Sequence, residues 1–527
     1  MPQLSSADHS QSPPQVLIPR DYNAAHDLIA RNLDAGRGAK TAFIDDAGAY
    51  SYAELADRVD RCAGALTALG LQQEDRIMVC LLDGIDFPAV FLGAIKAGIV
   101  PVATNTLLTS ADYDFMLADS RAKALVVSEA LWPVFAPIVA KQRALRHIIV
   151  SGGDNHGQLD LSALMAAAAG GYAAAATTSD DACFWLYSSG STGTPKGTVH
   201  LHSHLLQTAE LYARPILGIR TDDVVFSAAK LFFAYGLGNG LTFPLSVGAT
   251  AVLMAERPTP AAVFRRLKQH RPSIFYGVPT LYGAMLASPE LPTRDELKLR
   301  VCTSAGEALP ADIGRRFTER FGVDILDGIG STEMLHIFLS NRPGDVRYGT
   351  TGKAVPGYEL RLVNEAGDPA APGEIGELQI CGPSSALMYW NSREKTKNTF
   401  MGPWTRSGDK YVVDAEGYYT YCGRSDDMLK VSGIYVSPFE VEAALMTHEA
   451  VLEAAVVAHT DADQLIKPKA YVVLKAGIKA DQALAAALQS HVKSQLAPYK
   501  YPRWIEFKDE LPKTATGKIQ RFRLKEV

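Results

Sequence analysis

Short apolar runs suited to buried strands alternate, along the first 250 residues, with segments whose apolar side chains recur at helical spacing. An apolar run at 76–83 (RIMVCLLD) precedes a helical segment at 87–98, and another apolar run follows at 99–104. Strand-like runs separated by helices indicate an α/β fold with largely parallel sheets. Further candidates for buried strands lie at 123–128, 146–151, 181–189 and 249–254.

The later part of the chain has a different pattern, and a length of 527 residues itself suggests more than one domain. After about residue 350, strand-like runs such as GEIGELQICG lie between Gly/Pro turns and predict a small β-rich subdomain. From residue 427 onward, helical and strand-like segments mix, which predicts a further α+β domain. The first 16 residues are rich in Ser, Gln and Pro, and we expect them to be disordered.

Composition excludes several classes of function. A net charge of −5 gives no reason to expect a nucleic-acid partner. The six cysteines contain no C-x-x-C pair, which favours reduced thiols in a cytoplasm over a disulfide frame or a zinc site. We find no secretory signal and no apolar run of the roughly 18 residues that a membrane span requires, so we expect a cytoplasmic protein without a membrane partner.

The stretch at 187–197 (YSSGSTGTPKG) departs from a P-loop at two positions. Counted from Gly190, Pro195 stands where a P-loop has its second Gly, and Gly197 follows Lys196 in place of Ser or Thr. Proline lacks an N–H donor and has a fixed φ, so this loop cannot form the same phosphate nest. Its hydroxyl side chains and single lysine still suit a flexible phosphate clamp, which predicts a phosphorylated ligand.

Three further segments accompany this loop in order: DGIGSTE at 327–333, a long run at 407–433, and PKTATGKIQR at 512–521. Together, the four resemble the core motifs of the adenylate-forming superfamily, which comprises acyl- and aryl-CoA synthetases, peptide-synthetase adenylation domains and luciferases. The resemblance extends from about residue 40 to the C-terminus. It implies that a carboxylate attacks the α-phosphate of ATP, and that a thiol then displaces AMP from the acyl-adenylate.

The resemblance also implies positions for the triphosphate and its metal. Thr332 is expected to hydrogen-bond the α-phosphate, and Glu333 to ligate Mg²⁺, which prefers carboxylate and phosphate oxygens. Hydroxyl donors and the point charge of a lysine suit the β- and γ-phosphates. The residues expected to line the triphosphate are Ser188, Ser189, Gly190, Ser191, Thr192, Gly193 and Lys196.

For the nucleoside, the resemblance points to the segment at 304–310 and to the start of DGIGSTE. Gly306 and Glu307 are expected beside adenine, and Asp327, Gly328 and Ile329 complete the nucleotide contacts. The family often has an aromatic residue at the position of Ile329, so here we expect apolar contact without ring stacking. Asp409 is expected to accept from both ribose hydroxyls, with Arg424 as its basic partner.

The remaining implied roles belong to the C-terminal domain. Lys518 resembles the lysine that bridges the substrate carboxylate and the α-phosphate, where its charge stabilises the transition state of the first half-reaction. Asp426 stands at the family's hinge, and Gly433 beside the tunnel for the pantetheine arm of coenzyme A. We therefore expect a disordered N-terminus at 1–16, an adenylation domain at 17–425 and a mobile C-terminal domain at 426–527.

The resemblance also implies an acid pocket, formed by KLFFAYGLGNG at 230–240 and by residues flanking GIGSTEMLHIF at 328–338. We expect Phe232 to pack in the core and Phe233 to gate the reacting carboxylate. Aromatic walls suit a small planar acid and exclude a long alkyl chain. The stretches YSSGSTGTPKGTVHLH at 187–202 and DGIGSTEMLHIFLSN at 327–341 look most like those of benzoate-CoA ligases, and next like those of 4-hydroxybenzoate-CoA ligases. The expected acid-binding residues are Phe233, Ala234, Tyr235, Ala305, Gly330, His336 and Ile337.

Several alternatives stay open. A 4-hydroxybenzoate-CoA ligase, or a ligase for another substituted benzoate, fits if His336 donates a hydrogen bond to a para hydroxyl. An adenylation enzyme that loads a carrier protein also fits, although LFFAYGLGNG has no Asp or Lys to pair with an amino acid's ammonium group. HLHSH at 200–204 suits a strand-to-helix junction better than a metal site. The oligomeric state is open, with a homodimer as one alternative.

Overall fold

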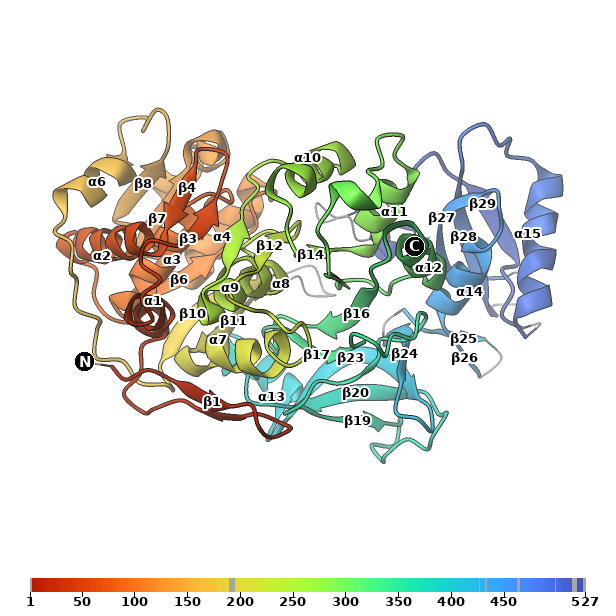
Figure 1. Cartoon of the computed structure of the whole chain (residues 1–527). Helices are drawn as coiled ribbons and strands as arrows, with labels where there is room; N and C mark the ends of the chain where they lie inside the picture. The colour runs from red at the N-terminus through yellow and green to blue at the C-terminus, as the bar shows by residue number, and fades with distance from the viewer. Residues whose placement is uncertain are drawn as a thin grey trace.

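The computed structural model of the chain describes residues 2–188, 195–425, 427–431, 434–461, 465–497, 499–513 and 519–524. It confirms the α/β prediction, with two large sheets of eight and nine strands in the first part of the chain. An antiparallel subdomain follows, and a small α+β domain ends the chain. Figure 1 shows these parts in sequence order, with the last domain in blue at the right-hand side.

The first large sheet has the strand order β21-β11-β10-β6-β5-β7-β8-β9 and is parallel from β10 to β9. Alternate residues of β5 face opposite layers, because Ile77 and Val79 join the core that α2 and α3 cover, whereas Met78 and Cys80 pack with Tyr113 of α4. The elements are α2 (Tyr52–Ala68), β5 (Arg76–Cys80), α3 (Asp86–Lys96), β6 (Val100–Ala103), α4 (Ser110–Ser120), β7 (Ala124–Ser128), β8 (His147–Ser151), β9 (Leu159–Asp160), β10 (Ala182–Ser188), β11 (Lys196–Leu201) and β21 (Met388–Tyr389).

The second large sheet has the order β18-β17-β16-β15-β14-β12-β13-β3-β4, with β16, β15, β14, β12, β13 and β3 parallel. In open α/β sheets, ligands bind beyond the carboxyl ends of such strands. The elements are β3 (Thr41–Ile44), β4 (Ala49–Ser51), β12 (Val224–Ser227), β13 (Thr250–Val252), α10 (Pro260–His270), β14 (Ile274–Gly277), α11 (Pro279–Ala287), β15 (Val301–Ser304), α12 (Ala311–Phe321), β16 (Ile325–Gly330), β17 (Ile337–Ser340) and β18 (Lys353–Ala354).

The segments after residue 350 form the predicted antiparallel subdomain. The segments from Leu429 onward form a separately packed unit with its own apolar cluster. The subdomain contains β19 (Glu359–Val363), β20 (Gly376–Cys381), β22 (Phe400–Met401), β23 (Trp404–Val413) and β24 (Tyr419–Arg424). The last unit contains β25 (Leu429–Val431), β26 (Ile434–Val436), α14 (Pro438–Met446), β27 (Val451–Thr460), β28 (Ile466–Leu474), α15 (Gln482–Gln495) and β29 (Trp504–Phe507).

Local sequence sets where helices begin. At the start of α2, the Ser51 hydroxyl accepts from the Glu54 N–H, and the Glu54 carboxylate accepts from the Ser51 N–H. This capping box satisfies two backbone donors that a helix start leaves without a partner inside the helix. The start of α2 therefore follows from the local sequence SYAE.

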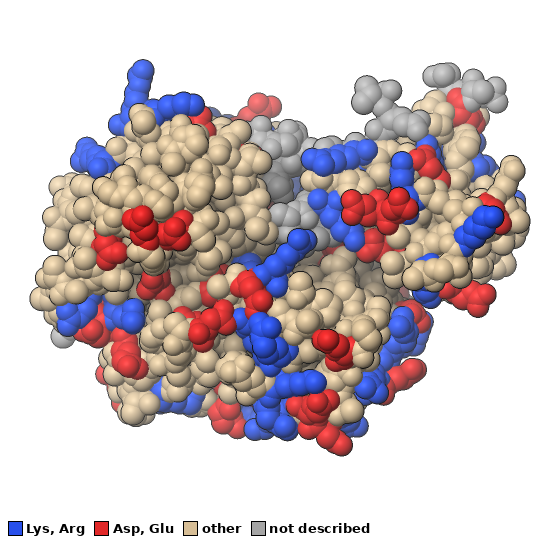
Figure 2. All heavy atoms as spheres, turned by 90° about the horizontal axis from the view of Figure 1, so that it is seen from above, with Lys and Arg blue, Asp and Glu red and all other residues tan. Residues whose placement is uncertain are grey.

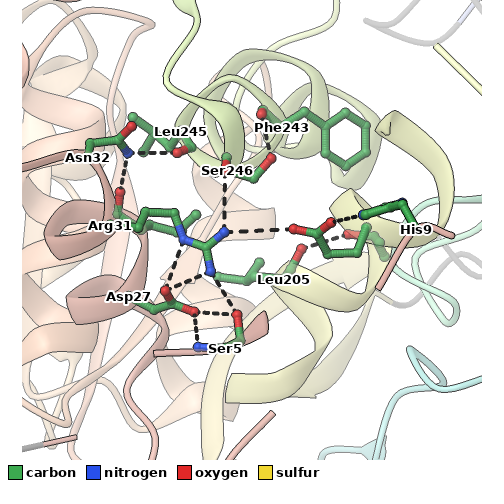
Figure 3. Close-up of polar contacts among 12 residues, drawn as sticks. Ser5, His9, Asp27, Arg31, Asn32, Leu205, Phe243, Leu245 and Ser246 are labelled. Atoms are coloured by element: carbon green, nitrogen blue, oxygen red, sulfur yellow. Dashed lines mark hydrogen bonds and ion pairs between the residues drawn. The ribbon is translucent and has the colours of Figure 1, made fainter. Parts of the chain in front are cut away.

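The N-terminus differs from the expectation of disorder at 1–16. Ser6–Asp8 (β1) pairs antiparallel with Gln15–Leu17 (β2), and polar side chains anchor this hairpin to the domain (Figure 3). The Ser5 hydroxyl donates to buried Asp27 over 2.6 Å, and His9 Nε2 lies 2.7 Å from the Glu210 carboxylate. Arg31 connects the two, at 2.7 Å from Asp27 and 3.7 Å from Glu210. The prediction failed because the composition of a polar segment does not reveal buried partners elsewhere in the fold.

The cysteines and the surface charges agree with the composition. All six cysteines are free thiols. Within the part of the chain that the structure describes, no helix is both long enough and apolar enough for a membrane span. Figure 2 shows lysine and arginine interspersed with acidic residues on the face seen from above, so neither sign dominates that face.

Candidate active site at the strand ends

The strand pair β10–β11 frames the predicted phosphate loop. Ser188, the last residue of β10, pairs in antiparallel register with Lys196, the first residue of β11. Both ends of the loop are therefore fixed side by side on the sheet, with Lys196 directed by a strand. The expected triphosphate residues Ser189, Gly190, Ser191, Thr192 and Gly193 lie outside the described residues.

The Glu333 carboxylate lies next to this strand pair. Its Oε1 accepts from the Tyr389 hydroxyl at 2.6 Å and from the Ser188 hydroxyl at 3.4 Å. The ammonium of Lys196 lies 4.3 Å from the centroid of the Tyr389 ring. Burial lowers the pKa of Lys196, while the negative charge of Glu333 opposes that shift. A cation, a carboxylate and a hydroxyl thus converge where a phosphate with its counter-ion is predicted to bind.

Thr332 and Glu333 occupy a tight turn between β16 and β17. The Met334 N–H donates to the Ser331 hydroxyl, and Leu335 has a φ of 65°, a left-handed conformation that is unfavourable for a leucine. Buried His200 donates from Nε2 to the Thr332 carbonyl over 2.7 Å. The backbone of this turn is therefore held from β11, on the other large sheet.

The histidine-rich stretch HLHSH forms the expected strand-to-helix junction. His200 is the next-to-last residue of β11, and His202 and His204 lie in α7 (His202–Thr208). Burial lowers the pKa of His200 and of His202 to about 4, so both imidazoles are neutral. His202 Nδ1 accepts from the Ala24 N–H at the start of α1 (Ala24–Asp34). Among the described residues, no group of three potential ligands could hold a metal ion.

The segments expected to bind adenine end two neighbouring strands. Ser304 of β15 pairs in register with Asp327 of β16, so Ala305, Gly306 and Glu307 emerge beside Gly328, Ile329 and Gly330. Asp327 is only 6% exposed, and burial raises the pKa of its carboxyl well above 3.8. Its Oδ1 has no hydrogen-bond partner among the described residues. An amino group, such as the one adenine carries, would give this oxygen a donor.

Asp409 and Arg424 are cross-strand partners in the antiparallel subdomain. They stand opposite each other on β23 and β24, with Arg424 Nη1 3.5 Å from Asp409 Oδ1. Asp409 is 7% exposed, whereas the Arg424 side chain is partly open to solvent. Two residues separated by a turn in the sequence thus meet as the expected carboxylate and its basic partner.

The expected acid-binding residues lie on two walls that meet. Phe233, Ala234 and Tyr235 are partly exposed, whereas Phe232 is buried in the core as predicted. The Tyr235 hydroxyl lies 2.5 Å from the Thr303 hydroxyl on β15, which fixes the ring. The second wall is formed by Ala305, Gly330, His336 and Ile337, of which all but Gly330 are buried.

His336 departs from the role of hydrogen-bond donor to a substrate. It is 2% exposed and packs between the rings of Tyr212, Tyr235 and Phe243. Its Nε2 lies 3.3 Å from the Tyr235 carbonyl and 3.2 Å from the Asn239 side-chain oxygen, both acceptors, so the proton belongs on Nε2.

Burial lowers the pKa of His336 to about 3, which leaves Nδ1 unprotonated at neutral pH. Nδ1 has no partner among the described residues. This nitrogen is an acceptor and has no proton to donate. The tautomer therefore contradicts the expectation that His336 donates a hydrogen bond to a para hydroxyl.

The expected C-terminal site residues Lys518, Asp426 and Gly433 lie outside the described residues. On either side of the segment at 514–518, which contains Lys518, Lys513 and Ile519 form an antiparallel β-bridge, so these two flanking residues lie side by side. Arg521 makes a two-pronged ion pair with buried Glu442, at 3.0 and 2.8 Å. The base of this segment is thus anchored on α14.

Sequence reasoning missed three groups that contact the predicted site residues. Tyr389 hydrogen-bonds Glu333, His200 hydrogen-bonds the Thr332 carbonyl, and Thr303 hydrogen-bonds Tyr235. Each contact joins residues 56 or more positions apart in the chain. No local spacing signals such contacts, and only the strand order of the two sheets creates them.

Comparisons with known proteins cover nearly the whole chain. The AMP-binding enzyme family matches residues 31–390, and the AMP-binding enzyme C-terminal domain matches residues 440–518. A benzoate–CoA ligase of Thauera aromatica is 69% identical over 524 residues, which are 99% of this chain and 99% of that protein. A 4-hydroxybenzoate–CoA/benzoate–CoA ligase of Rhodopseudomonas palustris is 53% identical over 96% of this chain and 94% of that protein. The solved structure of a benzoate CoA ligase from Burkholderia xenovorans LB400 has a TM-score of 0.90 and 57% identity, covering 96% of this chain and 100% of that one.

Proposed function

This chain belongs to the AMP-binding enzyme family, and we propose from that membership that it is an AMP-forming acid–thiol ligase that joins benzoate to coenzyme A. Benzoate and ATP give benzoyl-adenylate and diphosphate, and the thiol of coenzyme A then displaces AMP. One structural observation carries the assignment. A single turn bears Thr332 and Glu333 and leads directly into His336, so phosphate-binding and ring-binding groups share one short segment.

In the first half-reaction, the described residues hold the triphosphate. Lys196 offers a positive charge to the leaving phosphates, and Ser188 and Thr332 offer hydroxyl donors. Glu333 fits a magnesium ion, because its Oε2 has no hydrogen-bond partner among the described residues while Oε1 is already held. The ion would neutralise part of the charge on the phosphates. Asp409 would accept from the ribose hydroxyls.

The acid pocket favours a small planar ring. Phe233 and Tyr235 present partly exposed aromatic surface, and the Tyr235 ring cannot swing aside while its hydroxyl is held by Thr303. His336 behind them is neutral, so it attracts no carboxylate away from the nucleotide. The walls orient benzoate with its carboxylate toward the α-phosphate, and a long alkyl chain would find no space.

The roles of Lys518, Asp426 and Gly433 stay proposals drawn from the family resemblance. Lys518 would bridge the carboxylate and the α-phosphate, and the domain at 426–527 would then turn about Asp426. Gly433 would line the path of the pantetheine arm. The boundary between the domains at 17–425 and 426–527 is likewise a proposal.

A hydroxylated benzoate is the second candidate substrate. The observation in its favour is the bare Nδ1 acceptor of His336, whose ring packs against Tyr235. A ring hydroxyl could donate to it, whereas benzoate leaves it without a partner. Both acids would follow the same two half-reactions.

The cellular location and the oligomeric state are also proposals. Six free thiols suit a reducing cytoplasm, which we propose as the location. We expect small-molecule substrates and no nucleic-acid or membrane partner. A homodimer stays open, and light scattering on the purified protein would decide it.

The first test is AMP release by purified protein with ATP, Mg²⁺, coenzyme A and a panel of acids. The panel contains benzoate, 4-hydroxybenzoate, 2-aminobenzoate, cinnamate, acetate and octanoate. We expect AMP formation with benzoate that depends on coenzyme A. Acid-dependent diphosphate release without turnover of coenzyme A would indicate a carrier-protein acceptor instead. If no acid in the panel led to release of AMP or diphosphate, the pocket assignment would be refuted.

A further inference from the structure

We propose that Tyr389 is a positioning residue that joins the phosphate-binding lysine to the metal-binding carboxylate. This inference deepens the proposed function, because it rests on Glu333 as the ligand of Mg²⁺. Tyr389 lies outside the four segments that carry the family resemblance. Its hydroxyl and its ring nevertheless each contact one of the two charged residues on which triphosphate binding depends.

The hydroxyl of Tyr389 fixes the orientation of the carboxylate. It donates to Glu333 Oε1 over 2.6 Å. A phenol has an ordinary pKa of about 10, so it keeps its proton and remains a donor at neutral pH. With Oε1 held, the carboxylate can present Oε2 to a cation without first losing rotational freedom.

The ring of Tyr389 supports the lysine. Lys196 Nζ lies 4.3 Å from the ring centroid, within the range of a cation–π contact. Since β11 carries Lys196 and pairs with β21 at Thr198 and Tyr389, the ring is fixed to the same strand that directs the ammonium. One side chain therefore sets the separation between the cation and the anion that would bind the phosphates and their metal ion.

The segment around Tyr389 also grips the turn that carries Glu333. The Ala386 N–H donates to the Glu333 carbonyl over 2.8 Å, and the Ser384 hydroxyl donates to the Met334 carbonyl over 2.7 Å. Backbone and side chain of Glu333 are thus held by the same short stretch at 384–389. This double attachment is what a rigid ligand position requires.

Two substitutions separate the two contacts. Tyr389→Phe removes the hydroxyl and keeps the ring under Lys196, whereas Tyr389→Leu removes both. Tyr418→Phe is the matched control, because it deletes a tyrosine hydroxyl that binds the Asp345 carboxylate away from this cluster. Glu333→Gln tests the metal assignment itself.

The measurement is calorimetric binding of α,β-methylene-ATP, with Mg²⁺ and with EDTA, to variants whose folding is checked by thermal melting. For Tyr389→Phe we expect the gain in affinity from Mg²⁺ to fall about tenfold, as for loss of a hydrogen bond to a charged group, with the Kd in EDTA unchanged. Tyr389→Leu should also weaken binding in EDTA. Tyr418→Phe should bind like the unmodified protein.

The outcomes separate this inference from the proposed function. An unchanged or larger Mg²⁺ gain in Tyr389→Phe, alongside a lost gain in Glu333→Gln, would overturn the role of Tyr389 alone. A gain that survives Glu333→Gln would overturn both the metal assignment of Glu333 and the inference that depends on it. Neither result would affect the ligase activity that the acid panel measures.

Discussion

At the scale of single residues, burial fixes the protonation states around the site. The imidazoles of His200 and His336 are neutral, since burial lowers their pKa values to about 4 and about 3. The phenol of Tyr389 is protonated as well, and burial raises its pKa further above the ordinary value of about 10. Each group consequently has one hydrogen-bonding role at neutral pH, so the site keeps its geometry across the range in which a free histidine would titrate.

His202 should make the protein lose stability in mild acid. Burial lowers its pKa from 6.5 to about 4, so below pH 6.5 the unfolded chain gains a proton that the folded chain cannot accept. The stabilisation is complete above pH 6.5 and is lost progressively as the pH falls toward 4. We predict that His202→Asn, whose side-chain oxygen can still accept from Ala24, has a smaller drop in Tm between pH 7 and pH 5.

The drop in Tm is measured between two pH values for each protein separately, so a loss of stability that the substitution causes equally at both pH values cancels. Only the difference between the two pH values bears on the titration of His202. An identical drop in Tm for His202→Asn and the unmodified protein would show that this histidine does not titrate on unfolding.

His336 should determine preference among ring substituents. His336→Met keeps similar bulk but removes the Nδ1 acceptor, so we predict that kcat/KM for 4-hydroxybenzoate falls about tenfold relative to benzoate. Steady-state kinetics with both acids measures the ratio. Tyr212→Phe is the control, because it alters a hydroxyl on a neighbouring ring that lacks a partner among the described residues. An equal loss for both acids in His336→Met would mean that the residue serves packing alone.

At the scale of elements, short pairings hold the segments that carry the chemistry. The register of β10 and β11 fixes Ser188 beside Lys196, and the bridge between Lys513 and Ile519 does the same around the segment at 514–518. A loop whose ends are fixed loses less freedom when it binds a ligand.

The anchoring of the N-terminal hairpin depends on a buried ion pair. Arg31 pairs with fully buried Asp27 on α1, so Arg31→Met would leave a buried carboxylate without its cation. We predict a loss of about 3 kcal/mol in the free energy of unfolding, as for other broken buried pairs. Arg61→Met breaks a pair of the same spacing with Asp57 that is open to solvent, and should cost about 0.5 kcal/mol. Urea unfolding measures both, and equal effects would show that the N-terminal network adds nothing beyond a surface pair.

At the scale of the whole molecule, the proposed reaction would divide between two parts of the chain. The large domain supplies the groups around Glu333 and Tyr235, whereas the predicted catalytic lysine belongs to the small C-terminal unit. The family matches follow the same division, at 31–390 and 440–518. Such an arrangement allows one orientation of the small unit for each half-reaction.

Lys518→Ala should separate the half-reactions. Loss of its charge removes stabilisation from the attack of benzoate on ATP, so diphosphate release should fall by at least about a hundredfold. Formation of benzoyl-CoA from synthetic benzoyl-adenylate should remain within about threefold of the unmodified rate, because in the proposed mechanism that step does not use the lysine. Equal loss of both half-reactions would contradict this division of labour.

The α/β class, the antiparallel subdomain and the mixed C-terminal unit follow from the sequence because apolar periodicity is a local property. The four segments of the family resemblance likewise predicted roles for Lys196, Glu333 and Asp409, because their residue types and order are visible in the chain itself. The tertiary structure alone decided which groups hold them. Tyr389 reaches Glu333, His200 holds Thr332 and Arg31 anchors the N-terminal hairpin only after distant strands and helices pack together. Hydrogen bonds between such groups depend on distance in space, for which a sequence pattern contains no measure.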